Sequence, residues 1–217
     1  MTDVAPVDVD DPLAPPPLPD IHQTSRGALI AQFDDMLDRA QHAAVYKFLQ
    51  RPGWTYGWKS NPHTDVFSFL HKHFAGFLGE GDARPKNPDC ARELEVKAPF
   101  IYQLWLKLSD KLLNRHTLVR CYANGYPYGS DGTLHTDSEL PNSYTTIYYP
   151  HETWQPNWAG ETVLFNDERN DILTSVYPKP NRLIVFRGAT PHAARGVSRT
   201  CPVLRITLMF KTEIQDD

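Results

Sequence analysis

Two histidines and one aspartate in this chain have the residue types and order needed to hold a metal ion. His135 and Asp137 are separated by one residue, and His192 follows 57 residues after His135. Two imidazoles and a carboxylate form the facial triad that binds Fe(II) and leaves coordination positions open. Arg205, farther along in an apolar segment, carries a planar fork of donors that matches a carboxylate. These four residues predict an iron site with open coordination positions and an arginine beside it that can bind a carboxylate.

The His-Thr-Asp motif occurs twice, so the motif alone cannot place the metal. The first copy, His63 to Asp65, precedes a segment that reads as an amphipathic helix. There Thr64 or Asp65 is expected to cap the helix. The second copy, at 135–137, follows a glycine-rich segment and lies between two predicted strands. We therefore assign the metal to His135 and Asp137.

The second half of the chain reads as short strands separated by Gly, Pro, Asn and Asp. The predicted strands cover residues 118–124, 143–149, 162–166, 173–177, 182–186 and 203–211. Because side chains alternate along a strand, Arg205, Thr207 and Met209 share one face of the last strand. Arg205 then points between the sheets, where an unpaired guanidinium is costly and a bound carboxylate would offset that cost.

The first half reads as helical. Three helices are predicted over about residues 25–51, 62–79 and 99–112, with residues 80–95 as a polar loop. Ser25 is expected to cap the first helix, Pro52-Gly53 to end it, and Pro99 to open the third. Helices followed by strands favour an α+β fold with the helices packed on one face of an antiparallel structure.

The composition predicts the domain organisation of the protein, its kinds of partner and its cellular compartment. Residues 1–24 are rich in proline and aspartate and are expected to form a flexible leader, and residues 25–217 a single domain, helical over 25–116 with a β-core over 117–212. A net charge of −4 gives no reason to expect a nucleic-acid partner, and no segment is long and apolar enough to predict a membrane span. Neither a signal peptide nor a zinc or disulfide pattern of Cys90, Cys121 and Cys201 is present, so a reduced, cytoplasmic setting is expected.

Several short motifs surround the candidate ligands. They are Cys121–Asn124, Thr146–Tyr149, Gly160–Thr162 and Arg182–Phe186. With His135, Asp137, His192 and Arg205 in this order, they resemble the catalytic core of the prolyl 4-hydroxylase-like 2-oxoglutarate/Fe(II) oxygenases over about residues 117–212. The resemblance implies a double-stranded β-helix, a jelly-roll variant, as the β-core. The strand pattern alone would also fit other sandwiches.

The resemblance implies a dioxygenase in which His135, Asp137 and His192 hold Fe(II) and no other residue is catalytic. O2 and the cosubstrate 2-oxoglutarate would be consumed, succinate and CO2 released, and an unactivated C–H hydroxylated, with ascorbate supportive in vitro. Related halogenases replace the aspartate by a small residue, so Asp137 argues against halogenation. His151 follows His135 by only 16 residues, which is too close for the distal ligand.

The resemblance also implies a cosubstrate pocket. Arg205 would bind the distal carboxylate of 2-oxoglutarate, Tyr149 would donate its hydroxyl to the same carboxylate, Tyr122 would line the iron end, and Thr207 could add a hydroxyl. Each tyrosine and Thr207 could instead be plain packing. The residues leave open Arg195, Arg199 or Arg120 in place of Arg205, and Tyr148 in place of Tyr149.

Two aromatic loops, over residues 126–132 and 151–158, are expected at the mouth of the site, where specificity commonly lies. The candidate substrate contacts are Tyr128, Trp154, Trp158 and Asn124, although each tryptophan could pack as a lid on a sheet edge. We expect a small-molecule substrate, an amino acid or a natural product, because no accessory peptide-binding domain is evident. A peptide or protein prolyl side chain is the alternative, and a non-enzymatic jelly-roll module with a structural metal such as zinc is the alternative of another class.

Overall fold

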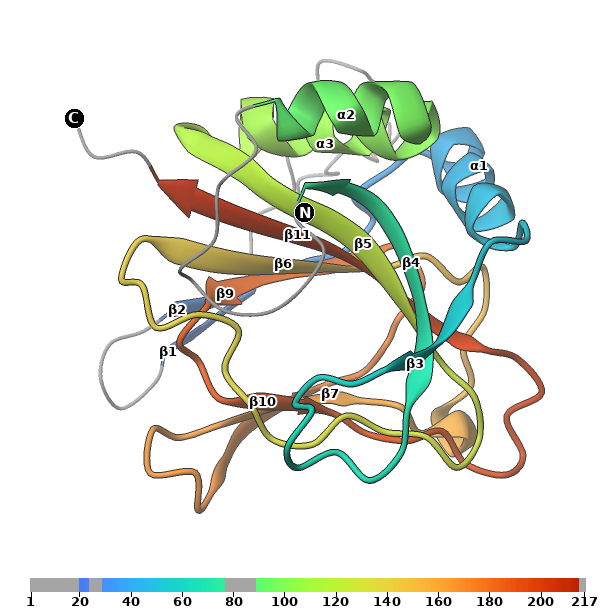
Figure 1. The fold of residues 1–217 in the computed structure, drawn as a ribbon, viewed down its shortest axis with the longest axis vertical. Helices are drawn as coiled ribbons and strands as arrows, with labels where there is room; N and C mark the ends of the chain where they lie inside the picture. The colour runs from blue at the N-terminus through green and yellow to red at the C-terminus, as the bar shows by residue number, and fades with distance from the viewer. Residues whose placement is uncertain (1–19, 24–28, 77–88, 215–217) are drawn as a thin grey trace, which may run out of the picture.

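Two antiparallel sheets form the computed structural model, which describes residues 20–23, 29–76 and 89–214 (Figure 1). The larger sheet contains β1 (Asp20–Gln23), β2 (Leu29–Phe33), β3 (Thr55–Trp58), β4 (Phe69–Gly76), β5 (His116–Tyr126), β6 (Ser143–Tyr149), β9 (Arg182–Arg187) and β11 (Arg205–Ile214). The smaller sheet contains β7 (Thr162–Phe165), β8 (Ile172–Val176) and β10 (His192–Ala194). The spatial orders are β1-β2-β9-β6-β11-β5-β4-β3 and β10-β7-β8. This arrangement agrees with the predicted double-stranded β-helix.

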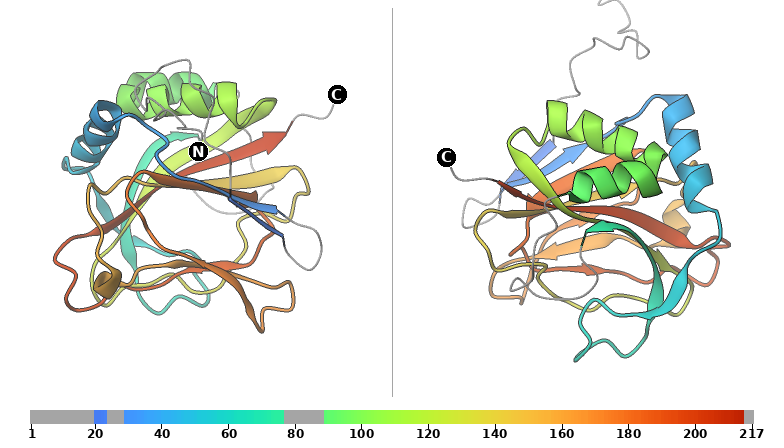
Figure 2. Two further views of the ribbon diagram at one scale, coloured as in Figure 1. Left: turned by 180° about the vertical axis from the view of Figure 1, so that it is seen from behind. Right: turned by 45° about the horizontal axis from the view of Figure 1, so that its top comes forward.

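Three helices lie together over the outer face of the larger sheet (Figures 1 and 2). They are α1 (Arg39–Leu49), α2 (Cys90–Lys97) and α3 (Pro99–Lys111), and a 3-10 turn covers Pro156–Trp158. The third helix begins at Pro99, as predicted, because the fixed φ of proline suits the first helical turn. The buried helix residues share a core with the outward side chains of β5, β6 and β11. Among the described residues, no helix has the length and apolarity required to cross a bilayer.

Alternation along the strands divides this protein into an outer and an inner core. On β11, Ile206, Leu208 and Phe210 belong to the core under the helices. Met209, on the opposite face, belongs to a second cluster between the sheets together with Tyr149. Side chains of the inner face are therefore directed toward the space between the sheets, which is where the candidate site lies.

Of the first two predicted helices, the first is right only over its second half and the second is wrong. Residues 29–33 form β2, which pairs with β9, and the helix begins only at Arg39, capped by Asp38, whose Oδ1 accepts the N–H of Gln41 at 2.8 Å. Ser25, the predicted cap, lies outside the described residues. Residues 69–76 form β4, in which a bulge between His73 and Ala75 disturbs the alternation. The buried residues of β4 are Phe69, His71, Phe74 and Ala75, a spacing that follows neither the strand period nor the helical period throughout.

Four shorter elements were also missed, and one of them is the strand β3 over residues 55–58. Residues 90–97, read as part of a loop, form α2, in which Cys90 and Leu94 are buried at helical spacing. Residues 20–23, read as part of the leader, form β1, because pairing with β2 uses main-chain groups and needs no apolar side chain. The remainder of the leader lies outside the described residues. The three-residue strand β10 was too short to show a period.

One buried side chain ties the segment before α1 to the larger sheet. Asn181, in the turn before β9, accepts the N–H of Leu37 at 3.0 Å and the hydroxyl of Tyr148 at 2.9 Å through Oδ1. Its Nδ2 donates to the carbonyl of Leu37 at 2.7 Å. Its φ is 61°, a left-handed conformation that asparagine tolerates better than most residues.

Replacing this side chain should destabilise the protein. Asn181→Ala would leave three buried polar groups of Leu37 and Tyr148 unsatisfied, and each such group costs about 1–3 kcal/mol. We expect the free energy of unfolding, measured by urea denaturation, to fall by about 3 kcal/mol or more. Asn114→Ala, at an exposed position after α3, is the matched control and should change it by less than about 0.5 kcal/mol. Equal stability of the two variants would contradict the prediction.

Candidate metal centre

The main chain brings the two candidate histidines together. His135 N–H donates to the carbonyl of His192 at 3.0 Å, and His192 N–H donates back to His135 at 2.9 Å, as in a pair of antiparallel strands. Asp137 N–H donates to the carbonyl of Gly188 at 2.8 Å. The segment around residues 135–138 is thus fastened to the turn between β9 and β10.

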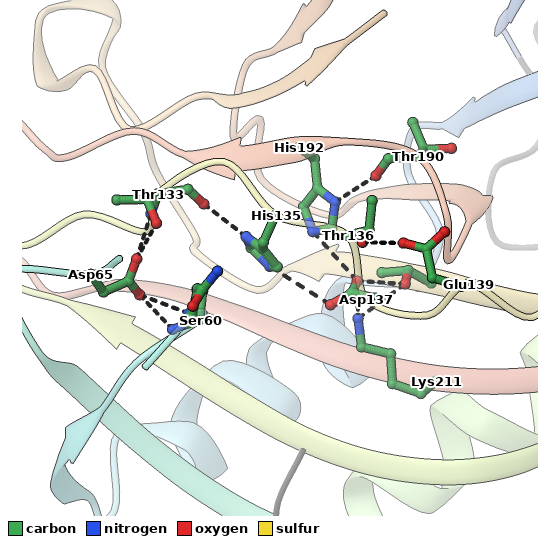
Figure 3. Close-up of polar contacts among 12 residues, drawn as sticks. Ser60, Asp65, Thr133, His135, Thr136, Asp137, Glu139, Thr190, His192 and Lys211 are labelled. Carbon is green, nitrogen blue, oxygen red and sulfur yellow. Dashed lines mark hydrogen bonds and ion pairs between the residues drawn. The ribbon is translucent and has the colours of Figure 1, made fainter. Parts of the chain in front are cut away.

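Each of the two imidazole rings is oriented by a hydrogen bond to a main-chain carbonyl. Nδ1 of His135 lies 2.8 Å from the carbonyl oxygen of Thr133, and Nδ1 of His192 lies 2.9 Å from that of Thr190 (Figure 3). A carbonyl can only accept, so each Nδ1 carries the proton and each Nε2 presents a lone pair. The Nε2 atoms lie 3.7 and 3.4 Å from the carboxylate oxygens of Asp137. All three ligand atoms lie within 4.8 Å of one another.

The carboxylate of Asp137 is held by two further side chains. Thr145 Oγ1 donates to its Oδ2 at 2.7 Å, and Lys211 Nζ donates to the same oxygen and to Thr145 Oγ1. Burial alone would raise the pKa of Asp137, but the charge of Lys211 and its hydrogen bond, with the charges that the two histidines carry when protonated, outweigh it and hold the pKa well below its usual range. Burial lowers the pKa of His192 to about 4. A carboxylate and a neutral imidazole are the ionisation states that bind a metal.

The side chains of His135, Asp137, His192 and Lys211 line a cavity of about 490 Å³. Its wall also includes Arg205, Thr207, Tyr122 and Asn124. Arg205 is only 1% exposed. Its Nε donates to the carbonyl of Gly160 and its Nη2 to Thr162 Oγ1 at 3.0 Å, while Nη1 has no partner in the part of the chain that the structure describes. Gly160 permits this approach, because a Cβ there would lie 2.9 Å from Arg205 Cδ. The guanidinium therefore keeps one buried donor for a ligand.

The tyrosine beside Arg205 is Tyr149. Its hydroxyl donates to Thr162 Oγ1 at 2.7 Å, the same oxygen that accepts from Arg205. Tyr148 faces the core under the helices and donates to Asn181. The alternative that placed Tyr148 at the cosubstrate in place of Tyr149 is therefore wrong. Arg195 and Arg199 are exposed and do not line the cavity, whereas Arg120 does.

The expected substrate residues are not gathered around the cavity. Asn124 lines it, but Tyr128 is 65% exposed and is not among its lining residues. Trp154 is buried, donates from Nε1 to the carbonyl of Ala159 at 2.9 Å and packs edge-on against Trp158 at 5.4 Å. Neither tryptophan lines the cavity, which agrees with the packing role left open above.

Sequence reasoning missed the cavity wall between β3 and β4. Trp58 to His63 line the cavity from this segment, and Trp58 stacks on His71 at 4.1 Å. The reading of residues 62–79 as a helix hid this wall. The expected helix cap at Thr64 or Asp65 is wrong for the same reason, because the next element is the strand β4. Lys211 was also missed, although it lies on the same face of β11 as Arg205.

Comparison with known proteins agrees with this geometry. Residues 118–210 match the family model described as the 2OG-Fe(II) oxygenase superfamily. The protein is similar in structure to a Pseudomonas putida prolyl-4-hydroxylase, with 17% identity and a TM-score of 0.58 over 90% of this chain and 94% of that one. None of the curated proteins matches the sequence significantly.

Two further solved structures are similar. One is an oxidoreductase of the 2OG-Fe(II) oxygenase family from Burkholderia pseudomallei, with 14% identity and a TM-score of 0.59 over 86% of each chain. The other is a prolyl hydroxylase from Trichoplax adhaerens in complex with a hypoxia inducible factor oxygen degradation domain peptide, with 16% identity and a TM-score of 0.56 over 85% of this chain and 83% of that one. At these identities the structures establish the shared fold. The family match confirms the resemblance predicted from the sequence.

The buried His71 should make the stability of the metal-free protein pH-dependent. Burial lowers its pKa to about 4 from the ordinary histidine value of 6.5, so the neutral form is favoured in the folded state. The stability it contributes is complete above pH 6.5 and is lost as the pH falls toward 4. At about 1.4 kcal/mol per pKa unit, this residue should account for a loss of about 3 kcal/mol.

Urea denaturation of the metal-free protein at pH 7.5 and 4.5 measures this effect. His71→Phe should show a smaller loss of unfolding free energy between the two pH values than the parent. His63→Ala, which removes an exposed histidine, is the control and should behave as the parent does. The same pH dependence in His71→Phe and in the parent would rule out His71 as its source.

Proposed function

We propose that this chain, whose β-core matches the 2OG-Fe(II) oxygenase superfamily, is a dioxygenase dependent on Fe(II) and 2-oxoglutarate that hydroxylates an unactivated C–H of a small molecule. The observation that carries the proposal is one cavity lined by the triad of His135, Asp137 and His192 and by Arg205 with its buried Nη1. An amino acid or a natural product is the proposed substrate.

The residues present fit both the metal and the cosubstrate. Two imidazole Nε2 atoms and one carboxylate are the donor set of the facial triad for Fe(II). The buried Nη1 of Arg205 fits a carboxylate, because a hydrogen bond from a charged donor to an ionised acceptor is stronger than one between neutral groups. When bound, iron and 2-oxoglutarate supply the oxidising chemistry, in which O2 is consumed and 2-oxoglutarate is converted to succinate and CO2.

The side chains of the protein have distinct tasks in this proposal. The carbonyls of Thr133 and Thr190 orient the two imidazoles, and Lys211 with Thr145 keeps Asp137 ionised and fixed. Fixing the ligands in advance lowers the cost of assembling the reacting groups.

Hydrogen bonds also fix the side chains at the proposed cosubstrate end of the cavity, around Arg205. Arg205 and Tyr149 both donate to Thr162 Oγ1, so the guanidinium and the hydroxyl lie side by side. Tyr149 does not line the cavity, and its hydroxyl has to turn away from Thr162 to donate to a distal carboxylate. Tyr122 and Thr207 complete this part of the cavity wall. A reducing, cytoplasmic setting goes with the proposal, because Cys90, Cys121 and Cys201 are all free thiols.

A prolyl side chain of a peptide or protein is the second candidate substrate. It is favoured by the similarity to prolyl hydroxylases, one of which is solved with a peptide. A non-enzymatic metal-binding module would use the same three ligands without turnover. Product analysis separates the three cases.

The first prediction of the proposal is succinate formation. Protein reconstituted with Fe(II), ascorbate and 2-oxoglutarate should form succinate above a metal-free control, and products 16 Da heavier should appear from a metabolite extract or from prolyl peptides. His135→Ala and Asp137→Ala should abolish both signals, whereas His63→Ala should keep metal binding. Absence of succinate with every substrate mixture would leave only the metal-binding module. Loss of metal in His63→Ala would overturn the assignment of the ligands.

The second prediction concerns affinity for 2-oxoglutarate. Arg205→Lys should weaken its binding and Arg205→Ala should weaken it more, by about 2–5 kcal/mol, because a buried charged pair loses one partner. Tyr149→Phe should cost less, about 1.5–3 kcal/mol at most, since only a hydroxyl is removed. Calorimetric titration of 2-oxoglutarate measures these changes. Iron affinity without cosubstrate should hardly change, and parent-like binding by Arg205→Ala would refute the clamp.

A further inference from the structure

The first His-Thr-Asp copy has a structural connection to the second. Asp65 is buried, with 5% exposure, although it lies in a surface segment between β3 and β4. Its Oδ2 accepts the N–H groups of Ser60 at 2.6 Å and Asn61 at 3.1 Å. Its Oδ1 accepts the N–H of Thr133 at 3.1 Å and the hydroxyl of Thr133 (Figure 3). The carboxylate thus joins two segments that are far apart in the sequence.

Thr133 is also the residue that orients the metal-ligand candidate His135. Its carbonyl oxygen accepts from Nδ1 of His135 at 2.8 Å. This hydrogen bond fixes which nitrogen carries the proton and how the ring is turned, and such partners affect metal affinity strongly. A continuous path of hydrogen bonds therefore runs from Asp65 through Thr133 to His135.

The second histidine needs no such carboxylate. Thr190, whose carbonyl orients His192, lies in the turn between β9 and β10, where its own N–H donates to the carbonyl of Arg187 at 3.0 Å. Its position is set by a main-chain turn. Thr133 lies in an irregular segment, where its N–H and hydroxyl are both taken by Asp65. The carbonyl that orients His192 is thus set by a turn, whereas the one that orients His135 is set by the side chain of Asp65 together with the main-chain bond from Gly132 N–H to the carbonyl of Ala194 at 3.0 Å.

We propose that Asp65 is a positioning residue for His135, acting through Thr133 on the orientation of the imidazole. The inference rests on the proposed function, since it takes His135 as a metal ligand. Asp65 also closes the turn that carries Ser60 and Asn61, two residues of the cavity wall. The cavity wall and the ligand are consequently held in one arrangement by the same carboxylate.

Asp65→Asn tests this role with little change in shape. An amide has only one acceptor oxygen, so it cannot serve both the Ser60–Asn61 side and the Thr133 side. We expect the dissociation constant for Fe(II), measured by anaerobic titration of the whole chain, to rise about 10–100-fold. With Co(II) as the probe, the ligand-field absorption bands should also shift, because the imidazole of His135 is no longer held in the same orientation.

Substitutions at Thr133 provide a milder test that does not depend on the folding of Asp65→Asn. Thr133→Val removes the hydroxyl and keeps the N–H and the carbonyl, so the loss of Fe(II) affinity should be smaller than in Asp65→Asn. Thr133→Ser keeps the hydroxyl and should restore the affinity and the Co(II) spectrum of the parent. A parent-like Thr133→Val with a weakened Thr133→Ser would contradict the path.

Asp38→Ala is the matched control for stability. Asp38 is also a carboxylate that accepts a main-chain N–H, but at the start of α1, away from the cavity. Its loss should lower the melting temperature and leave Fe(II) affinity and the Co(II) spectrum unchanged. If Asp65→Asn behaves in the same way, Asp65 is only a structural residue and the proposal is overturned. If the parent binds neither metal, the proposed function itself fails and the positioning role fails with it.

Discussion

The candidate site depends first on the main-chain pairing of His135 with His192. Each residue donates its N–H to the carbonyl of the other, so the two ligands face each other before any side-chain contact is considered. The pairing requires the segment after β5 to return beside β10, and β10 is in turn held by β7. Asp137 joins them because its own N–H is fastened to Gly188. The main-chain bonds between the segment after β5 and the segment from Gly188 to β10 therefore position all three candidate ligands.

Charge is the second constraint, because a buried ion is costly unless it is compensated. Asp137 and Lys211 compensate each other within the protein. Arg205 has neutral oxygens as its hydrogen-bond partners, and among the described residues its Nη1 meets none. The first arrangement is complete by itself, whereas the second is improved by a carboxylate from a ligand. This difference separates Lys211, whose charge is already compensated, from Arg205, the residue that we propose binds the cosubstrate.

The sequence predicted the β-core best where side-chain alternation is undisturbed. The strand over residues 143–149 and the inward face of Arg205 follow from that period, and Lys211 could have been found by extending it. The period failed at β4, where a bulge makes Phe74 and Ala75 both buried. β2 is held by pairing with the distant strand β9 and β1 by pairing with β2, and the local pattern of side chains does not reveal either pairing. The contact of Asp65 with Thr133, 68 residues away, is of the same kind.

The two sides of the cavity carry different information about function. Arg205, Thr207 and Tyr122 come from strands within the match over residues 118–210, so the family similarity bears on the iron and the cosubstrate. The wall from Trp58 to His63 precedes that match, and loops on a rigid scaffold are where substrate choice commonly lies. Asp65 links this wall to the residue whose carbonyl orients the proposed ligand His135. If this wall selects the substrate, substitutions in it that change the specificity would have to keep the carboxylate of Asp65 or replace its hydrogen bonds to Thr133.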